Sequence, residues 1–304
     1  MSAKHICTAG AAALLGLLAC NDQPTQSTEP NRPVDPAPAA ESAALSAATV
    51  TVAAAGDITG CSSGSQASAT AKLVEKIPGL VLTLGDNAYP DGSTANFRCY
   101  NSSWGKFKSR TRPAPGNHDY HMSNAAGYFS YFGSAAGPSR RGYYSFDAGA
   151  WHIVSLNSES NLSAEGPWLK ADLAANRAKC TLAYWHQPLF TSGAVHPPAT
   201  KMRPLFTILY NAGAEIVLSG HNHQYERFAP QNPTGAADPT KGIVQFVAGT
   251  GGEGTYAFRS PMRNSQARYR GFGVLRLELR LGGYTYSFIP VSGGFKDTGS
   301  GPCH

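Results

Sequence analysis

The chain has 304 residues, of which 14% are charged, and its formal net charge is +6, from 25 lysines and arginines against 19 aspartates and glutamates. This mild excess is spread along the chain and contains no basic run of the kind that binds nucleic acid, so it indicates anionic small molecules or simply a solvated basic face. The length predicts one large domain or two small ones. The sequence shows no internal repeat.

The first residues predict an export signal. An apolar run over 9–19 is too short for the ~20 residues of a membrane-spanning helix but suits the core of a signal peptide. The segment Leu17–Cys20 resembles a bacterial lipobox. We therefore expect residues 1–19 to be removed and Cys20 to be lipidated; the alternative is an ordinary secretory signal that is cut nearby.

Residues 20–48 consist mostly of proline, alanine and small polar residues. Such a segment buries too little apolar surface to offset its ordering entropy, so it predicts a disordered tether. The folded domain is then expected over 49–304. These features predict an exported protein, either a lipoprotein of the bacterial cell envelope or a secreted or periplasmic protein.

Within 49–304, β-type and helical segments alternate early, and β-type segments dominate later. The predicted strands, in chain order, are Thr49–Ala55, Leu80–Leu84, Thr111–Ala114, Tyr143–Phe146, Trp151–Leu156, Thr181–Trp185, Glu215–Leu218, Ile243–Val247, Gly273–Leu279 and Tyr284–Ile289. The predicted helices are Gln66–Ile77, a helix capped by Ser163 and one near Met202–Asn211. This order predicts an α/β fold with helices layered around two packed sheets.

Five short polar clusters follow predicted strands, where open α/β sheets bind their ligands. They begin at Gly56, Gly85, Gly116, Trp185 and Gly220. Each cluster alone is weak evidence, since Gly-Asp often forms a plain turn and a lone histidine is often a core residue. Together they supply carboxylate, phenol, amide and imidazole donors, which are Asp57, Asp86, Tyr89, Asn117, His186, His221 and His223. This donor set predicts a site for two metal ions, an arrangement that attacks phosphate esters.

The series Asp, Gly-Asp-x-x-Tyr, Gly-Asn-His-Asp, strand-end His and Gly-His-x-His resembles the calcineurin-like metallophosphoesterases, specifically their purple acid phosphatase branch. The run Gly220–Arg227 is similar to that branch beyond the ligands, and Tyr89 selects the same branch. The resemblance covers nearly all of 49–290. It implies a four-layer α-β-β-α sandwich of two mixed sheets flanked by helices.

The resemblance also implies a role for each donor. Asp86 would bridge both ions. A ferric ion would be completed by Asp57, Tyr89 and His223, and a divalent ion, which is zinc, iron or manganese, by Asn117, His186 and His221. Phenolate and carboxylate suit a hard trivalent ion, whereas imidazole and amide oxygen suit a borderline divalent one.

The function expected from this centre is hydrolysis of small phosphomonoesters by attack of a metal-bound hydroxide. His118 is the first candidate proton donor, with Asp119 placed to orient it, and His196 is the second, although His196 also fits an ordinary loop residue. His121 and His152 have no motif context and are expected to be structural. The alternatives are a phosphodiesterase with two divalent ions on the same scaffold and a surface-anchored binding protein without turnover.

Four cysteines remain after the export signal and Cys20 are set aside. In an exported protein they favour disulfides, and four cysteines allow three pairings. We favour Cys61 with Cys99 and Cys180 with Cys303, the second fastening the C-terminal tail; free buried thiols are the alternative. The expected partners are a small phosphate ester, no nucleic acid, and a membrane only through the lipid anchor.

The glycine-rich segment 249–254 lacks the Lys-Ser/Thr of a P-loop, so we expect a loop at the rim of the site. Substrate selectivity is expected to reside in the loops near 91–110, 121–141 and 187–203. The aromatic residues Phe129, Tyr131, Tyr143 and Tyr144 are expected to pack in the core or in a hairpin.

Overall fold

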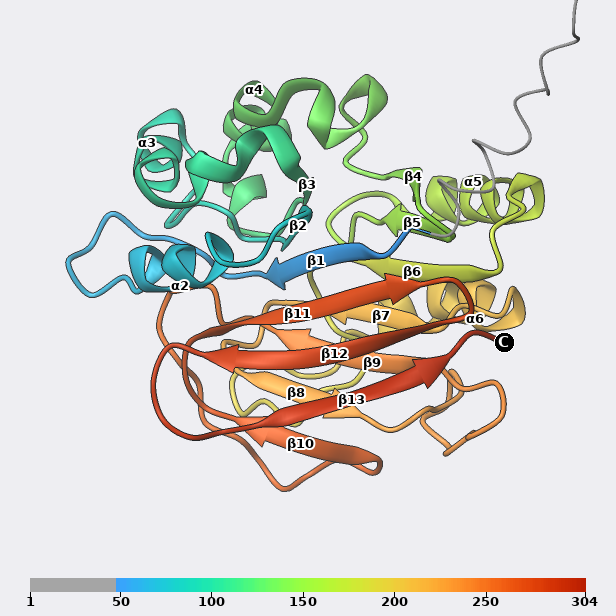
Figure 1. Ribbon diagram of the computed structural model, residues 1–304. Helices are drawn as coiled ribbons and strands as arrows, with labels where there is room; N and C mark the ends of the chain where they lie inside the picture. The colour runs from blue at the N-terminus through green and yellow to red at the C-terminus, as the bar shows by residue number, and fades with distance from the viewer. Residues whose placement is uncertain (1–47) are drawn as a thin grey trace, which may run out of the picture. The chain divides into compact units, whose positions relative to one another are not determined.

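The computed structural model describes residues 48–304 (Figure 1). The predicted signal segment 1–19, the lipidation site Cys20 and all but the last residue of the tether 20–48 lie outside the described residues. Within the described part, none of the helices combines the length and the apolar character that crossing a bilayer requires.

Two mixed sheets form the centre of the fold. The six-stranded sheet has the order β13-β12-β11-β1-β2-β3, and its strands are β1 (Val50–Ala55), β2 (Leu80–Leu84), β3 (Thr111–Ala114), β11 (Gly273–Arg280), β12 (Gly283–Pro290) and β13 (Asp297–Pro302). The strands β1, β2 and β3 run parallel, with Val52 opposite Leu80 and Val81 opposite Thr111. Their carboxyl ends therefore lie at one edge of this sheet.

The seven-stranded sheet has the order β10-β8-β9-β7-β6-β5-β4. Its strands are β4 (Tyr144–Ala148), β5 (Trp151–Ser155), β6 (Cys180–Tyr184), β7 (Ile216–Ser219), β8 (Tyr225–Phe228), β9 (Val244–Ala248) and β10 (Ser265–Tyr269). The central strands β5, β6, β7 and β9 are parallel. Every residue of β7 is buried, as expected for a parallel strand covered on both faces.

Helices cover the outer face of each sheet, which gives four layers (Figure 1). On the six-stranded sheet, Ala53 and Val81 pack in one apolar cluster with α2 (Ala67–Val74), α3 (Thr94–Ser103) and α4 (Ala126–Phe132). On the seven-stranded sheet, Ala183 and Val217 pack with α5 (Leu162–Ala175) and α6 (Arg203–Asn211). A third cluster, which includes Leu82 and Leu218, fills the space between the sheets. The predicted four-layer sandwich is confirmed.

The predicted elements are present, with ends shifted by a few residues, and the structure adds others. The cap of α5 differs from the prediction: the Asn161 side chain accepts from Ser163 N, and Ser163 lies inside the helix. The elements that the sequence pattern did not indicate are α3, α4, β8, β10 and β13. Of the four aromatic residues assigned to packing, Phe129, Tyr143 and Tyr144 are buried and Tyr131 is half-buried.

Both favoured disulfides are present. Cys61 is joined to Cys99, which ties the loop after β1 to α3, and Cys180 is joined to Cys303. The second bond connects the start of β6 in one sheet with the chain just beyond β13 in the other. The C-terminal tail is therefore fastened across the sandwich, as predicted.

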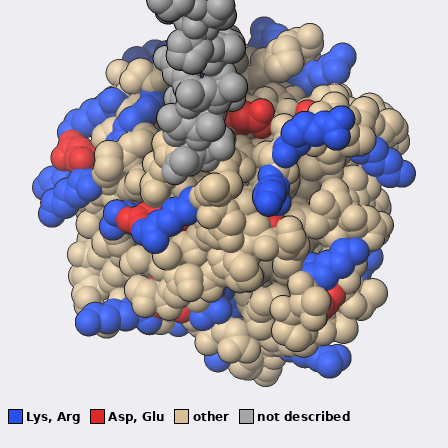
Figure 2. Space-filling view, turned by 45° about the vertical axis from the view of Figure 1, so that its right-hand side comes forward, with Lys and Arg blue, Asp and Glu red and all other residues tan. Residues whose placement is uncertain are grey.

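Positive charge is distributed over the surface. On the face drawn in Figure 2, lysine and arginine side chains lie in several separate groups, with aspartates and glutamates among them. This face carries no continuous basic stripe, which agrees with a charge excess that is spread along the chain.

Candidate metal centre

The predicted donors lie at the edge where the carboxyl ends of the parallel strands meet. Asp57 follows β1, Asp86 follows β2 and His221 follows β7, and all three have positive φ, at 58°, 48° and 69°. A non-glycine residue in this region costs about 1–3 kcal/mol, so the surrounding structure must hold it there. Such outliers cluster at functional sites.

Glycines next to these donors permit the close approach of the two sheets. Gly85 has a φ of +83°, and a Cβ there would lie 2.5 Å from the His186 ring. A Cβ on Gly116 would overlap the Asp86 carboxylate and its backbone nitrogen. Glycine is therefore required at both positions for Asp86 and His186 to meet.

One group of donors surrounds the Tyr89 hydroxyl. The Tyr89 hydroxyl lies 2.9 Å from Asp57 Oδ1, 3.0 Å from Asp86 Oδ2 and 3.1 Å from His223 Nε2. His223 Nε2 also lies 3.3 Å from Asp57 Oδ1. The structure thus brings together the four residues predicted for the ferric position.

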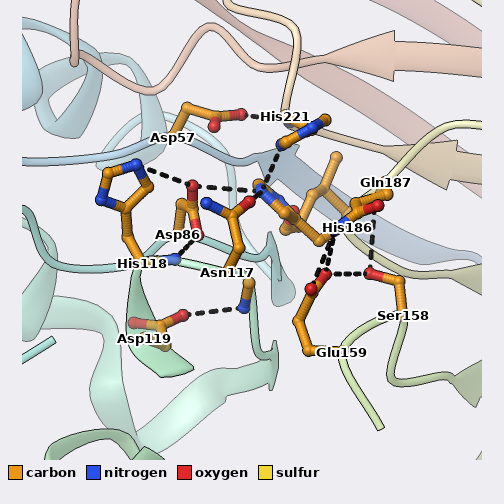
Figure 3. Close-up of polar contacts among 12 residues, drawn as sticks. Asp57, Asp86, Asn117, His118, Asp119, Ser158, Glu159, His186, Gln187 and His221 are labelled. Carbon is orange, nitrogen blue, oxygen red and sulfur yellow. Dashed lines mark hydrogen bonds and ion pairs between the residues drawn. The ribbon is translucent and has the colours of Figure 1, made fainter. Parts of the chain in front are cut away.

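A second group surrounds His186 Nε2. This nitrogen lies 3.1 Å from Asp86 Oδ2, 3.1 Å from Asn117 Oδ1 and 3.2 Å from His221 Nδ1. Figure 3 shows Asp86 between His118 and His186, with His221 above His186. Asp86, His186 and His221 each offer a ligand atom, and these atoms lie within 4.8 Å of one another. Asp86 Oδ2 belongs to both groups.

These spacings fit two metal ions. For bonds of about 2.1 Å, donors at right angles around an ion lie about 3.0 Å apart. The donor separations in both groups range from 2.9 to 3.3 Å. The residues therefore fit a pair of ions that share one carboxylate oxygen.

The remaining polar atoms of the donors are held by the chain itself. His221 N donates to Asp57 Oδ2 at 2.7 Å, and His118 N donates to Asp86 Oδ1 at 2.8 Å. His186 Nδ1 lies 2.9 Å from the carbonyl oxygen of Leu84, which fixes its proton on Nδ1. Nε2 of His186 then faces the oxygens of Asp86 and Asn117, so either a proton or a metal cation must lie between these atoms.

The pKa shifts of the donor side chains agree with the need for a cation at this site. Burial alone opposes the charged imidazolium, yet the carboxylates of Asp86 and Asp57 raise the pKa of His186 to about 10. Burial and then the charge of His186 lower the pKa of His221 to about 3, so His221 is a neutral ligand. Burial, followed by the charges of Asp57 and Asp86, raises the pKa of the Tyr89 phenol. The site draws positive charge toward the shared carboxylate oxygen.

His118 lies beside the centre with one nitrogen facing it. Its Nδ1 lies 2.6 Å from the carbonyl oxygen of Pro90, and its Nε2 lies 4.0 Å from Asp86 Oδ2. Its ring packs on Tyr89 at 4.2 Å between centroids. The Pro90 carbonyl therefore orients His118 so that Nε2 faces the donor set.

The prediction that Asp119 orients His118 is wrong, because the Asp119 carboxylate contacts other groups. The buried Asp119 carboxylate accepts from the Asn87 backbone and side chain and from Gly116 N, and no hydrogen bond joins it to His118 (Figure 3). Burial raises the pKa of Asp119 to about 7, and the charge of Asp86 adds to this effect. Asp119 ties the loop after β2 to the loop after β3, and so holds the two loops that carry Asp86 and Asn117.

His196 does reach the site. Its ring stacks on His221 at 4.0 Å, and the Asn222 side chain bonds both its backbone N–H and its carbonyl. His121, expected to be merely structural, lies next to His118 and 3.1 Å from the Pro90 carbonyl. His152, with the same expectation, is buried elsewhere, between two carboxylates.

A supporting network was missed by the sequence analysis. Both oxygens of Glu159 accept from Gln187 Nε2 at 2.8 Å, and Ser158 donates to Glu159 at 2.7 Å (Figure 3). Gln187 directly follows His186, so this network holds the loop that carries a predicted ligand. The adjacency of Gln187 to His186 was the one signal in the sequence, and it does not reveal the partner.

A cavity of about 620 Å³ opens beside the donor set. It is lined by Gly60, Cys61, Ser62, Tyr89, Pro90, His118, His223, Glu253, Gly254 and Tyr256. The rim position predicted for 249–254 is confirmed, since Gly251 N and Glu253 N donate to the carbonyls of Gly56 and Asp57. The expected selectivity loops do not line this cavity, because the loop after β1 and the loop after β9 occupy its walls.

This chain is similar in sequence to known phosphoesterases. Residues 50–225 match the family model described as calcineurin-like phosphoesterase. Purple acid phosphatase 15 of Arabidopsis thaliana is 30% identical over 222 residues, which is 59% of this chain and 41% of the relative. Purple acid phosphatase 22 of the same plant is 35% identical over 149 residues, covering 45% of this chain and 34% of the relative.

The fold is shared with solved structures. Purple acid phosphatase PPD1 from yellow lupin (Lupinus luteus) seeds superimposes with a TM-score of 0.64 at 17% identity, covering 84% of this chain and 54% of that one. The chain spans less than half the length of the two curated relatives it matches. The family model covers more than half of the chain, and the predicted resemblance is confirmed. The chain belongs to the calcineurin-like phosphoesterase family.

Proposed function

We propose that this protein is an exported phosphatase that hydrolyses small phosphomonoesters at a dinuclear metal centre. The observation that carries the proposal is the position of Asp86 Oδ2, which lies 3.0 Å from the Tyr89 hydroxyl and 3.1 Å from His186 Nε2. One carboxylate oxygen thus belongs to two donor groups of different chemistry.

In this proposal Asp86 would bridge a ferric ion, which Asp57, Tyr89 and His223 would also hold, and a divalent ion of zinc, iron or manganese. The divalent position is completed by Asn117, His186 and His221. When bound, the pair supplies Lewis-acid activation of the phosphoryl group and of water. A hard trivalent ion suits Tyr89, because the buried phenol needs a strong positive charge to ionise.

His118 supplies the proton that the leaving alcohol requires. Its Nδ1 is held by the Pro90 carbonyl, so Nε2 is the atom presented to the reacting centre, and its side chain is 29% exposed toward the cavity. His196, whose ring stacks on His221 at 4.0 Å, is the second candidate proton donor. Such proton transfer contributes roughly 10²–10⁴-fold to a rate.

Export and a lipid anchor at Cys20 belong to the same proposal. The two disulfides support an oxidising compartment. A small phosphate ester is then the partner, a membrane is contacted only through the lipid, and nucleic acid is not bound.

The test joins metal analysis, visible spectrum and turnover. We expect two metal ions per chain, a tyrosinate-to-iron colour that Tyr89→Phe abolishes, and faster cleavage of 4-nitrophenyl phosphate than of bis(4-nitrophenyl) phosphate. A colourless enzyme that prefers the diester would instead show a phosphodiesterase with two divalent ions. A metal-replete protein that cleaves neither ester would show a binding protein without turnover.

A further inference from the structure

The lining of the cavity beside the donor set includes a carboxylate that has no cationic partner among the other lining residues. Among its lining residues Glu253 is the sole carboxylate apart from the donor set, and no lysine or arginine is among them. Within the described residues, the Glu253 carboxylate takes part in no ion pair, and its Oε2 is buried without a hydrogen-bond partner. A buried acceptor of this kind costs about 1–3 kcal/mol until a donor reaches it.

The chain fixes this carboxylate in place. Glu253 N donates to the carbonyl of Asp57 at 3.0 Å, so the residue is anchored directly to the metal-centre loop. Its carboxylate lies against Gly60, where a Cβ would be 2.6 Å from Oε2. Any larger residue at position 60 would displace the carboxylate. The Cys61–Cys99 disulfide holds the neighbouring residue of this loop.

The same cavity also reaches the donor set. Tyr89, His118 and His223 are among its lining residues and belong to, or lie next to, the donor set. A volume of about 620 Å³ accommodates a small ester. A substrate that fills it would place its phosphate at the metal centre and its alcohol part against Glu253.

We propose that Glu253 selects phosphomonoesters whose alcohol part carries a primary ammonium group. This inference rests on the proposed function and specifies its substrate class. A carboxylate in a half-buried cavity attracts an ammonium more strongly than in water, and it repels a second phosphate or carboxylate. Tyr256, which stacks on His223 at 4.0 Å, also lines the cavity.

The test compares esters of equal length. 2-Aminoethyl phosphate and propyl phosphate differ in an ammonium against a methyl group, and 2-hydroxyethyl phosphate offers a neutral donor. We expect the wild type to favour the amine in kcat/KM by about tenfold or more over both others. In Glu253→Gln, which keeps the shape and removes the charge, the ratio should fall close to one. Glu75→Gln, on an exposed residue paired with Lys106, is the matched control and should keep the wild-type ratio.

A binding measurement separates selection from turnover. Calorimetry with 2-aminoethylphosphonate and propylphosphonate, which are not hydrolysed, should show the same preference and the same loss in Glu253→Gln. Equal binding of the two phosphonates by the wild type overturns the inference, even if the variant fails to fold. A hydroxyl ester that is favoured as much as the amine also overturns it, as does a loss of metal from Glu253→Gln. A wild type that binds the phosphonates selectively but cleaves no ester would overturn the proposed function, while the preference of Glu253 for an ammonium group in the ligand would still hold.

Discussion

The metal centre and the cluster around His152 both bury imidazole among carboxylates, but they pair their atoms in different ways. His152 Nδ1 lies 2.7 Å from Asp147 Oδ1 and its Nε2 lies 2.8 Å from Asp172 Oδ2. Ser145 and Asn176 donate to those two carboxylates. Both ring nitrogens of His152 thus face carboxylate oxygens, so the imidazolium is paired without a metal ion.

At the metal centre, acceptors face one another. The Leu84 carbonyl accepts a hydrogen bond from His186 Nδ1, so Nε2 faces the oxygens of Asp86 and Asn117 and needs a proton or a metal cation between them. Such crowding is costly unless a cation lies between the atoms. A buried group with matched partners is therefore structural, whereas a buried group with surplus acceptors indicates a missing cation.

The largest expected effect is at the shared oxygen. Asp86→Ala should lose one or both ions and at least about a thousandfold in kcat/KM, because it removes a ligand from each position. Elemental analysis and turnover of 4-nitrophenyl phosphate measure both effects. Asp147→Ala, in the cluster around His152, should keep both ions and its activity. If Asp86→Ala kept two ions and full turnover, the cluster around Asp86 would not need a metal ion any more than the cluster around His152 does.

The next effect separates His118 from its neighbour His121. His118→Ala should slow alkyl phosphates by roughly 10²–10³-fold and activated aryl phosphates by less than about tenfold, because good leaving groups need no proton. His121→Ala should slow both classes equally and little. Equal slowing of both classes by His118→Ala would argue against proton donation.

Glu159 tests the support of the divalent position. Glu159→Gln should weaken metal binding by roughly 10- to 100-fold, because Gln187 loses the carboxylate that holds the loop of His186. Metal titration of the metal-free protein measures this, and kcat at saturating metal should change little. Glu75→Gln serves as the control. An unchanged metal affinity in Glu159→Gln would show that the Glu159 network does not support metal binding.

The smallest effect on activity is expected at His152, where the change concerns stability. Burial opposes the charge on His152, but the hydrogen bonds that it donates to Asp172 and Asp147 raise its pKa. Since the folded pKa lies above the unfolded one, this stabilisation is complete below the unfolded pKa near 6.5 and is lost as the pH rises through the folded pKa. His152→Gln should therefore cost about 2 kcal/mol near pH 5.5 and clearly less near pH 9. Denaturant unfolding at both pH values measures it, and a cost independent of pH would contradict the charged pairing.

The sequence could predict the donors because each follows a buried strand and has a chemically distinct side chain. Parallel strands bring their carboxyl ends to one edge, so the order of the motifs determined their convergence. The cysteine pairing was also predictable, because the number of cysteines left few alternatives. The supporting contacts were not predictable, because Pro90 and Asn87 act through a carbonyl and through backbone geometry that leave no pattern in the sequence.

The helices and strands that the sequence did not predict also depend on contacts that leave no pattern in the sequence. The strand β13 has the sequence DTGSGP, which has little β-propensity, and it forms because β12 offers an edge and Cys303 is fastened to Cys180. The helix α4 is short and rich in aromatic residues, and its helicity comes from packing of Tyr128, Phe129 and Phe132 against the sheet rather than from propensity. Tertiary contacts therefore determine the secondary structure of both β13 and α4.

Asp86 is expected to lie between two ions. Anomalous diffraction from crystals of the metal-loaded protein tests this position most directly. We expect two peaks about 3.5–4 Å apart, one next to Tyr89 and one next to His186, with the Asp86 carboxylate between them. A single peak, or two peaks that do not both contact Asp86, would contradict it.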